Sequence, residues 1–200
     1  MEIISIKNKE KISEIVDIHL NTFVGFFLTD LGKGFLKNLY IGYLEDKNSG
    51  ILIAVEKNKV IGFLAYSNDY SNFYKNLLKK KIVKFGFYSL ISLLKHPIYF
   101  NRIIGAFGKS EEVKKSDKYV ELASIGVESS FEGKGVGTQL INQLKKITDF
   151  NKYKYISLET DAKNNEKVNS FYKSNNFKLF YTYKTKQGRL MNEYHYTNDD

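Results

Sequence analysis

The sequence predicts an α/β fold, in which helices cover both faces of a mixed β-sheet. Apolar residues alternate over several short segments, as in strands, and recur with helical spacing in the segments between them. The chain has 200 residues, of which 42% are hydrophobic and 15% aromatic, enough for one domain with a sizeable core. A glycine-rich stretch, residues 127–138, lies between a predicted strand and a predicted helix. We therefore expect a single domain over residues 1–200.

The N-terminal part predicts a strand followed by two helices. Residues 2–6 alternate between apolar and polar side chains, and residues 9–22 place their apolar side chains on one helical face. Residues 26–34 form an aromatic turn in which Thr29 or Asp30 is the expected N-cap of the second helix. The apolar positions of the two helices are Ile12, Ile15, Val16, His19, Leu20 and Phe23, then Phe35, Leu36, Leu39, Tyr40 and Tyr43.

A hairpin and then a long helical insertion are expected next. Residues 50–56 and 60–67 are two β-rich segments separated by a short polar turn. Residues 69–118 are too many for a structureless loop inside a compact domain. An apolar stripe predicts a helix that ends at Pro97, and residues 98–104 predict a second short helix. The stripe consists of Val83, Phe87, Leu90, Ile91 and Leu94.

Positive charge is concentrated in this insertion. The chain carries a net charge of +9, and residues 75–115 hold ten Lys or Arg against two Glu, a local balance of +8. A localised basic element favours an anionic partner, which is either a phosphorylated substrate or a membrane surface. An added layer that covers the sheet is the alternative that needs no partner.

The C-terminal part alternates strands and helices. Residues 119–127 predict a strand, and the glycine-rich stretch leads into a helix. Residues 153–161 predict the next strand, residues 164–174 a short helix, and residues 177–197 a final hairpin. The helix after the glycines has apolar residues at Val136, Leu140, Ile141, Leu144 and Ile147.

Three glycines at alternate positions, Gly133, Gly135 and Gly137, predict an anion-binding loop. Glycine lets the backbone approach a ligand closely and adopt a positive φ. Successive N–H groups and the N-terminus of the following helix then favour a phosphate or pyrophosphate group. The spacing excludes the dinucleotide-binding GxGxxG motif and the GxxxxGK[ST] P-loop. A flexible surface turn is the alternative.

The glycine-rich stretch resembles the acetyl-CoA loop of the GNAT superfamily of N-acetyltransferases, V-x-P-x-x-[QR]-G-x-G-[IVL]-[GA]. Val127, the three glycines and Val136 are in register with this pattern. Ser129 replaces the usual Pro, and Glu132 replaces the usual Gln or Arg. Because the family binds phosphate mainly through backbone N–H groups, we expect binding to survive the change at Glu132.

Residues 165–177 are similar to a second motif of that family, N-x-x-A-x-x-[FL]-Y-x-x-x-G-F. Val168 replaces Ala, and Asn176 replaces Gly; Asn is the next best residue for a left-handed helix terminus. Two motifs in the right order and at the right separation are more specific than either alone. The resemblance covers residues 118–180 well.

The resemblance implies a mostly antiparallel sheet whose fourth and fifth strands splay apart, with acetyl-CoA as co-substrate. The backbone of Ile125 and Val127 is expected to pair with the pantetheine arm like an added strand, and Asn165 to add a side-chain hydrogen bond. The implied acetyl-CoA-binding residues are Ile125, Val127, Glu132, Gly133, Lys134, Gly135, Val136, Gly137, Thr138, Asn165 and Tyr172.

Two residues are candidates for proton transfer. By the resemblance, Tyr172 is the general acid that protonates the departing thiolate of CoA. By the same resemblance, Glu121, six residues before Val127, is the candidate general base that deprotonates the attacking amine. The alternatives are a tyrosine on a helix surface and a glutamate on a strand surface, with ordered water as the base.

The acceptor-binding residues expected from the sequence are His19, Phe27, Leu28 and Thr29. His19 lies on an apolar helix face, where a packed core histidine is the more frequent outcome. The segment that follows it loosely resembles one in GNAT proteins of amino-sugar pathways. A nucleotide-linked amino sugar or another small amine therefore suits the basic insertion. A protein N-terminus is an alternative, and a cationic polyamine suits the insertion less.

The expected reaction is direct attack of an amine on acetyl-CoA, without a covalent enzyme intermediate, because the chain contains no Cys. A non-catalytic acetyl-CoA-binding or membrane-docking module is the rival function. No metal site is expected, and no nucleic-acid-reading motif is present. No run of 18 apolar residues and no signal peptide is found, so a cytoplasmic location is predicted. A monomer or homodimer is expected, and peripheral membrane contact is an open alternative.

Overall fold

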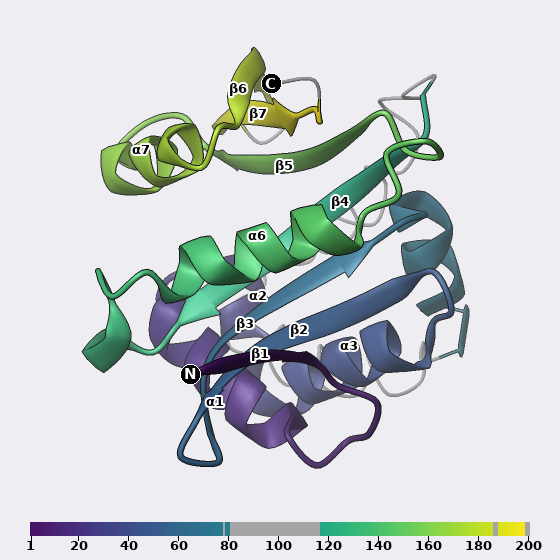
Figure 1. The fold of residues 1–200 in the computed structure, drawn as a ribbon, viewed down its shortest axis with the longest axis vertical. Helices are drawn as coiled ribbons and strands as arrows, with labels where there is room; N and C mark the ends of the chain where they lie inside the picture. Colours follow the sequence, from purple (N-terminus) through teal and green to yellow (C-terminus); the bar gives the residue numbers. More distant parts are fainter. Residues whose placement is uncertain (78, 81–116, 186–187, 199–200) are drawn as a thin grey trace.

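The computed structural model describes residues 1–77, 79–80, 117–185 and 188–198 of the chain. These residues contain a seven-stranded sheet in the order β1-β2-β3-β4-β5-β7-β6 (Figure 1). All neighbouring strands are antiparallel except β4 and β5, which are parallel. The predicted mixed and mostly antiparallel sheet is therefore confirmed. The strands are β1 (Glu2–Ser5), β2 (Ser49–Glu56), β3 (Lys59–Ser67), β4 (Tyr119–Val127), β5 (Tyr155–Asp161), β6 (Lys178–Lys184) and β7 (Leu190–Tyr196).

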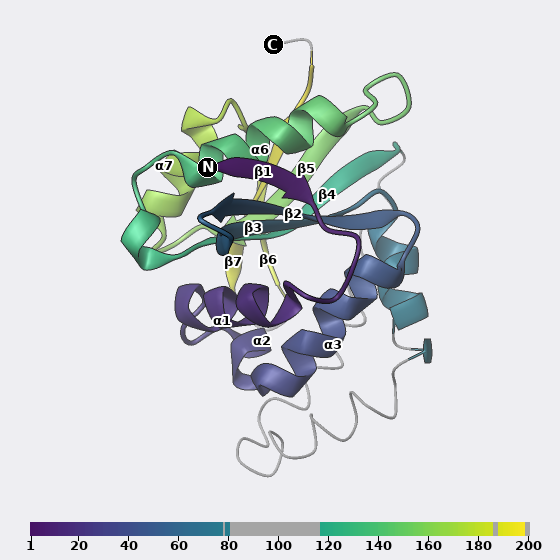
Figure 2. The same cartoon turned by 60° about the horizontal axis from the view of Figure 1, so that its bottom comes forward.

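Helices cover both faces of this sheet, as Figure 2 shows. The helices α1 (Ile12–Thr22), α2 (Phe27–Asp30) and α3 (Gly32–Glu45) lie on one face, and α6 (Val136–Ile147) lies on the other. The helix α7 (Glu166–Ser174) packs into the same core as α6. Successive side chains of a strand point to opposite faces. Accordingly, Ile51 and Ile53 of β2 join the core under α1 and α3, whereas Leu52 and Ala54 join the core under α6.

The predicted N-cap of the second helix is wrong. Thr29 and Asp30 lie inside the short helix α2, and α3 begins at Gly32, with Leu31 as its cap residue and no side-chain cap. The Thr29 hydroxyl instead donates a hydrogen bond of 2.6 Å to the carbonyl oxygen of Phe23. The side chain that looked like a cap therefore ties α2 to the end of α1.

Only the beginning of the predicted insertion lies among the described residues. Residues 70–77 are helical, and Phe73 and Leu77 are buried in the core under α1 and α3. The predicted helix with its apolar stripe, the short helix at residues 98–104 and most of the basic residues lie outside the described residues. Within the described part of the chain, no helix is both long enough and apolar enough to span a membrane.

The two central strands separate after a short common ladder, which confirms the predicted splay. β4 and β5 pair only from Tyr119 to Glu121 on one strand and from Tyr155 to Ser157 on the other. Beyond these three pairs the strands diverge (Figure 1). The β3–β4 ladder shifts register at the same level, because Ala65 pairs with Ser124 and Tyr66 with Leu122. An extra residue of this kind bends a strand, so the bulge explains why β4 leaves its neighbour here.

Candidate active site

The separated part of β4 presents backbone groups toward the gap that its ladder with β3 does not use, and of these the carbonyl oxygen of Val127 accepts from the Thr22 hydroxyl at 3.3 Å. In an antiparallel ladder, residues that exchange hydrogen bonds with the partner strand alternate with residues that do not. The N–H of Glu128 donates to the carbonyl oxygen of Ile61 at 2.9 Å. Counting back along the ladder, Ile125 and Val127 direct their backbone groups away from β3 and toward β5. The two residues predicted to act through their backbone therefore line the gap.

The predicted acetyl-CoA loop has the conformation that its glycines suggest. After a short 3-10 turn (Ser129–Phe131), Gly133 and Gly135 have φ values of 74° and 78°. A Cβ added to either glycine would meet no atom within 4 Å, so both border open space. Gly137 has a different role, because a Cβ there would lie 2.9 Å from the ring of Phe171. The third glycine thus allows α6 and α7 to approach each other.

The first turn of α6 offers unpaired N–H donors. Gly135 is the cap residue and has no side chain to accept from them. The first N–H with an acceptor at this end belongs to Gln139, which donates to the carbonyl of Gly135 at 3.0 Å. Among the described residues, nothing accepts from the N–H groups of residues 135–138. A helix N-terminus with free donors attracts an anion, as the sequence predicts for Val136 and Thr138.

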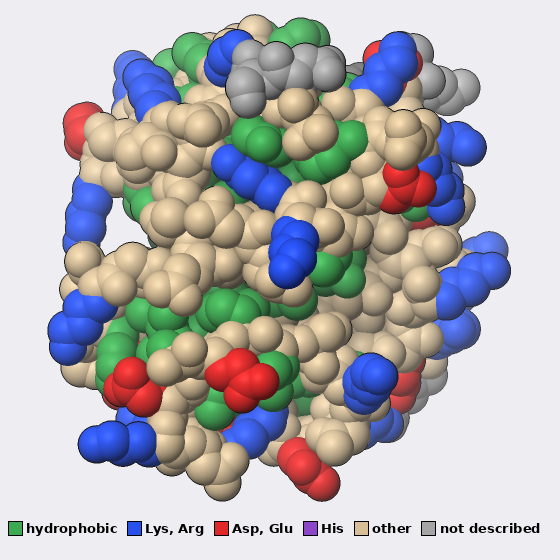
Figure 3. Space-filling model, in the orientation of Figure 1, with side chains coloured by type: hydrophobic (Ala, Val, Ile, Leu, Met, Phe, Trp, Pro, Cys, Tyr) green, Lys and Arg blue, Asp and Glu red, His purple; other side chains and the backbone are tan. Residues whose placement is uncertain are grey.

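Two charged side chains flank the loop and were predicted to contact the ligand. Glu132 forms an ion pair of 2.6 Å with Lys167 of α7, and the Lys134 ammonium lies 4.9 Å from the centre of the Phe131 ring. Lys167 places a positive charge beside Glu132, which explains how the loop accommodates a carboxylate where the family has Gln or Arg. Figure 3 shows the surface hollowed between α7 and the loop, at the left of the view.

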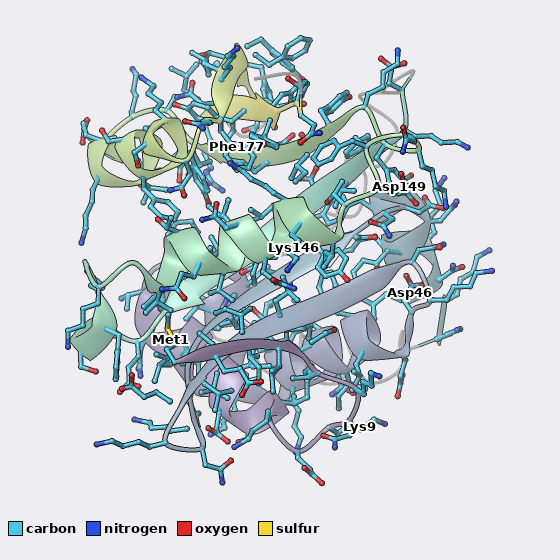
Figure 4. The ribbon with its side chains drawn as sticks, in the orientation of Figure 1. Met1, Lys9, Asp46, Lys146, Asp149 and Phe177 are labelled. Atoms are coloured by element: carbon cyan, nitrogen blue, oxygen red, sulfur yellow. The ribbon has the colours of Figure 1, made fainter. Side chains whose placement is uncertain are left out.

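Tyr172 is a buried residue of α7, with 7% of its surface exposed. Its ring lies 6.0 Å from that of Phe177, which Figure 4 labels at the junction of α7 and β6, and 6.1 Å from that of Tyr194. Burial raises the pKa of the Tyr172 phenol above its usual value. The hydroxyl therefore keeps its proton at neutral pH, which a general acid requires. The alternative of a helix-surface tyrosine is wrong.

Glu121 is also buried, with 7% exposure, and is the last β4 residue paired with β5. Its neighbours Val120 and Leu122 point into the core under α6. By strand alternation, Glu121 faces the opposite side of the sheet, where burial and, as a smaller contribution, the charge of Glu121 raise the pKa of Tyr70 and Tyr74. The alternative of a surface glutamate is wrong. The two candidate proton-transfer groups thus lie on opposite faces of the sheet, and Glu121 lies where the two strands part.

His19 is a core residue with 3% exposure. Its Nδ1 lies 2.6 Å from the Tyr40 hydroxyl, and its ring centre lies 4.5 Å from that of Phe23. Burial lowers the pKa of His19 to about 4, so the ring is neutral at pH 7. Leu28 packs against the same core. With the Thr29 hydroxyl bonded to Phe23 and the Phe27 side chain outside the described residues, acceptor contacts at these four positions stay a prediction.

Asn165 uses its amide to fix the junction between β5 and α7. Its Nδ2 donates to the Thr160 hydroxyl at 2.8 Å and to the carbonyl oxygen of Asp161 at 3.1 Å. Sequence reasoning missed Asn169, which lies one helical turn later and binds the same carbonyl. The four-residue spacing of the two asparagines was the available signal, because it places both side chains on one helix face.

The comparisons with known proteins decide the family. The model of the acetyltransferase (GNAT) family matches residues 13–177, most of the chain. This protein belongs to the GNAT acetyltransferase family. No curated protein sequence matches it. As a GNAT acetyltransferase, it uses acetyl-CoA as co-substrate.

Solved structures of acetyltransferases share the fold, two of them over nearly the whole chain. An N-acetyltransferase from Staphylococcus aureus Mu50 is 14% identical, with a TM-score of 0.65 and coverage of 98% of this chain and 100% of the other. A ribosomal-protein-alanine N-acetyltransferase from Brucella melitensis is 15% identical, with a TM-score of 0.61 and coverage of 98% and 99%. A third protein, from Bacillus anthracis Ames, was solved in complex with acetyl coenzyme A and is 18% identical, with a TM-score of 0.51 and coverage of 79% and 67%.

The residues of this GNAT chain fit acetyl-CoA. The unpaired N–H groups at the start of α6 and the open space at Gly133 and Gly135 suit a pyrophosphate. The backbone groups of Ile125 and Val127 suit an arm that contains amide groups.

Proposed function

We propose that this GNAT protein transfers the acetyl group of acetyl-CoA to the primary amine of a small molecule by direct attack. The observation that carries this proposal is the gap between β4 and β5, which is bordered by backbone groups of Ile125 and Val127 that β3 does not pair and has a buried Tyr172 and a buried Glu121 on opposite faces. A thioester held in that gap is open to attack from the face of Glu121. Its sulfur then lies toward the face of Tyr172.

The proton transfers follow from this arrangement. Glu121, directly or through one water, accepts the proton of the amine as the new N–C bond forms. Tyr172 donates its proton to the sulfur as the C–S bond breaks, so CoA leaves as a thiol. Since the chain has no Cys, attack through an enzyme thiolate is not available. After the transfer, Glu121 carries an additional proton and Tyr172 lacks one. Proton exchange with solvent then returns both groups to their starting states.

The acceptor class that we favour is an amine with a phosphate group, such as a nucleotide-linked amino sugar. Support comes from the net charge of the chain, +9, of which residues 75–115 contribute +8. A positive surface raises the local concentration of an anionic substrate. A screen of amines with and without phosphate groups, which records the release of CoA thiol, tests this choice. Equal rates for both sets would contradict it.

The first test concerns the glycine loop. We expect Gly135→Asp to weaken acetyl-CoA binding at least tenfold, about 1.4 kcal/mol, because the added carboxylate occupies open space beside the helix N-terminus where the pyrophosphate is bound. Calorimetric titration with acetyl-CoA measures the effect.

A positive φ strains any residue other than glycine, so the loop variant needs a control for strain. Gly188 has a φ of 84° in the turn between β6 and β7, where an added Cβ would have only an ordinary contact. Gly188→Asp should therefore bind acetyl-CoA as the wild type does. Gly135→Ala separates strain from charge at the loop itself. Unchanged affinity in a folded Gly135→Asp protein would remove the loop from the site.

The second test concerns the proposed base. We expect Glu121→Gln to remove or shift the limb of the pH–rate profile that reports deprotonation, because the amide cannot accept the amine proton. The profile of kcat/KM against pH, with a saturating concentration of acetyl-CoA, measures this. Glu128→Gln is a matched control, because Glu128 is also on the β4 side of the gap but pairs with Lys59. An unshifted profile for Glu121→Gln would assign the base role to water.

A further inference from the structure

We infer that Asn169 is a positioning residue that holds the end of β5 away from β4 and thereby keeps the acetyl-CoA gap open. This inference rests on the proposed function, because it assigns a purpose to the gap. It concerns a side chain that neither family motif specifies, since Asn169 falls on an unspecified position of the second motif.

The Asn169 side chain uses its full hydrogen-bonding capacity. Its Nδ2 donates to the carbonyl oxygen of Asp161 at 2.9 Å and to that of Asn165 at 2.7 Å. Its Oδ1 accepts from Asn192 Nδ2 at 2.8 Å and from the Tyr194 hydroxyl at 2.8 Å. An amide side chain offers two donors and two acceptor sites. All four are occupied, by partners from β5, from the cap of α7 and from β7.

Burial makes the hydrogen bonds of Asn169 costly to break. Asn169 is 7% exposed and Tyr194 is fully buried. A buried polar group that loses its partner costs far more than an exposed one, so the side chain holds its partners in one geometry. A second layer supports it, because the Thr182 hydroxyl of β6 donates to Asn192 Oδ1 at 2.7 Å. The network therefore spans β5, α7, β7 and β6.

The residue of β5 that Asn169 contacts lies at the end of the strand, beyond its ladder with β4. Asp161 is the last residue of β5, four positions after the last pair with β4. Its carbonyl accepts from both Asn165 and Asn169, and its carboxylate accepts from Arg189 at 2.8 Å. Every one of these contacts draws the end of β5 toward α7 and β7. None of them connects it to β4.

The same side chain also places the proposed acid. Asn169 lies three residues before Tyr172, and Phe171 of the same helix packs on Gly137 beside the loop. The helix α7 is thus fixed to β5 and β7 through Asn169 and to α6 through Phe171. Loss of the Asn169 anchor would let the end of β5 and the Tyr172 side chain move together.

The test compares Asn169→Ala with a matched control on the same helix, Asn175→Ala. Asn175 is 5% exposed, and within the described part of the chain its side-chain amide donates to the carbonyl oxygen of Phe171 in α7. We expect Asn169→Ala to weaken the binding of CoA about tenfold and to lower kcat. We expect Asn175→Ala to change CoA affinity less than twofold, even where both variants lose similar thermal stability. Titration at low temperature, where both are folded, gives the affinities.

A more conservative variant keeps the inference testable even where Asn169→Ala does not fold. Tyr194→Phe removes one of the two hydrogen bonds to Asn169 Oδ1 and preserves the buried ring, so it should weaken CoA binding by about threefold. Amide hydrogen exchange gives a readout without ligand: exchange at residues 158–162 should accelerate in Asn169→Ala and not in Asn175→Ala. CoA affinity and exchange equal to wild type in Asn169→Ala would overturn the inference. A wild-type protein that does not bind CoA would instead overturn the proposed function.

Discussion

Replacing Tyr172 with Phe is expected to lower kcat by about 10²–10⁴-fold, the usual contribution of a positioned general acid. The variant keeps the ring that packs on Phe177 and Tyr194 and removes only the hydroxyl. Burial keeps that hydroxyl protonated at neutral pH, so the wild type has a proton to give to the departing sulfur. The KM for acetyl-CoA should stay nearly unchanged. Initial rates of CoA thiol release with a good acceptor measure both quantities.

The matched control is Tyr153→Phe, because Tyr153 is another buried tyrosine of the same core. Both variants remove one phenolic hydroxyl, and only Tyr172 lies on the helix beside the loop. A full rate in Tyr172→Phe would reduce Tyr172 to a packing residue. An equal loss in both variants would attribute the effect to the core rather than to proton transfer.

The second large effect concerns pH and stability. The pKa of His19 falls from 6.5 to about 4 on folding, because burial disfavours the charged ring. Between these values the unfolded chain binds a proton that the folded protein does not, so stability is complete above pH 6.5 and declines as the pH falls toward 4. A shift of this size corresponds to about 3 kcal/mol in the free energy of unfolding.

Urea unfolding at pH 7 and at pH 4.5 measures this loss, and His19→Asn provides the comparison. An Asn side chain can still bond to the Tyr40 hydroxyl and does not titrate. The variant should be less stable at pH 7, because it fills less of the core, and its stability should fall less between the two pH values. Parallel losses in wild type and variant would show that other groups cause the acid sensitivity.

Among the described residues, the order and type of most elements were predictable from periodicity, and the loop from its glycines; the exception is the short helix α2, where a turn was expected. Tyr172 and Glu121 could be located only by their register in the two motifs, and the sequence left open whether either is exposed. Exposure depends on which elements pack together. Glu121 is buried because β4 lies between β3 and β5, where Ser67 and Ser157 are its paired neighbours, and these residues come from distant parts of the chain.

Two features of the site were not predictable in this way. The bulge in β4 arises from a one-residue mismatch with β3, and no residue type marks it in the sequence. The partners of Asn169 on β7 lie 23 and 25 residues away. Their side chains reach α7 only because of the register of β5 with β7, and a shift of one residue would send them to the other face. Tertiary pairing, rather than local propensity, decides both features.

The short β4–β5 ladder has a further consequence for aggregation. Unpaired strand edges at the rim of a sheet attract strands of other chains, and proteins protect such edges. Here the backbone groups of Ile125 and Val127 that β3 does not pair are interior to the sheet, with helices on either face. An incoming polypeptide strand carries side chains above and below its backbone, and these would collide with the helices. The pantetheine arm of CoA is narrower than a strand over most of its length, because only its pantoate unit is branched, by two methyl groups and a hydroxyl. We therefore expect the gap to favour a pantetheine arm over the strand of a neighbouring chain.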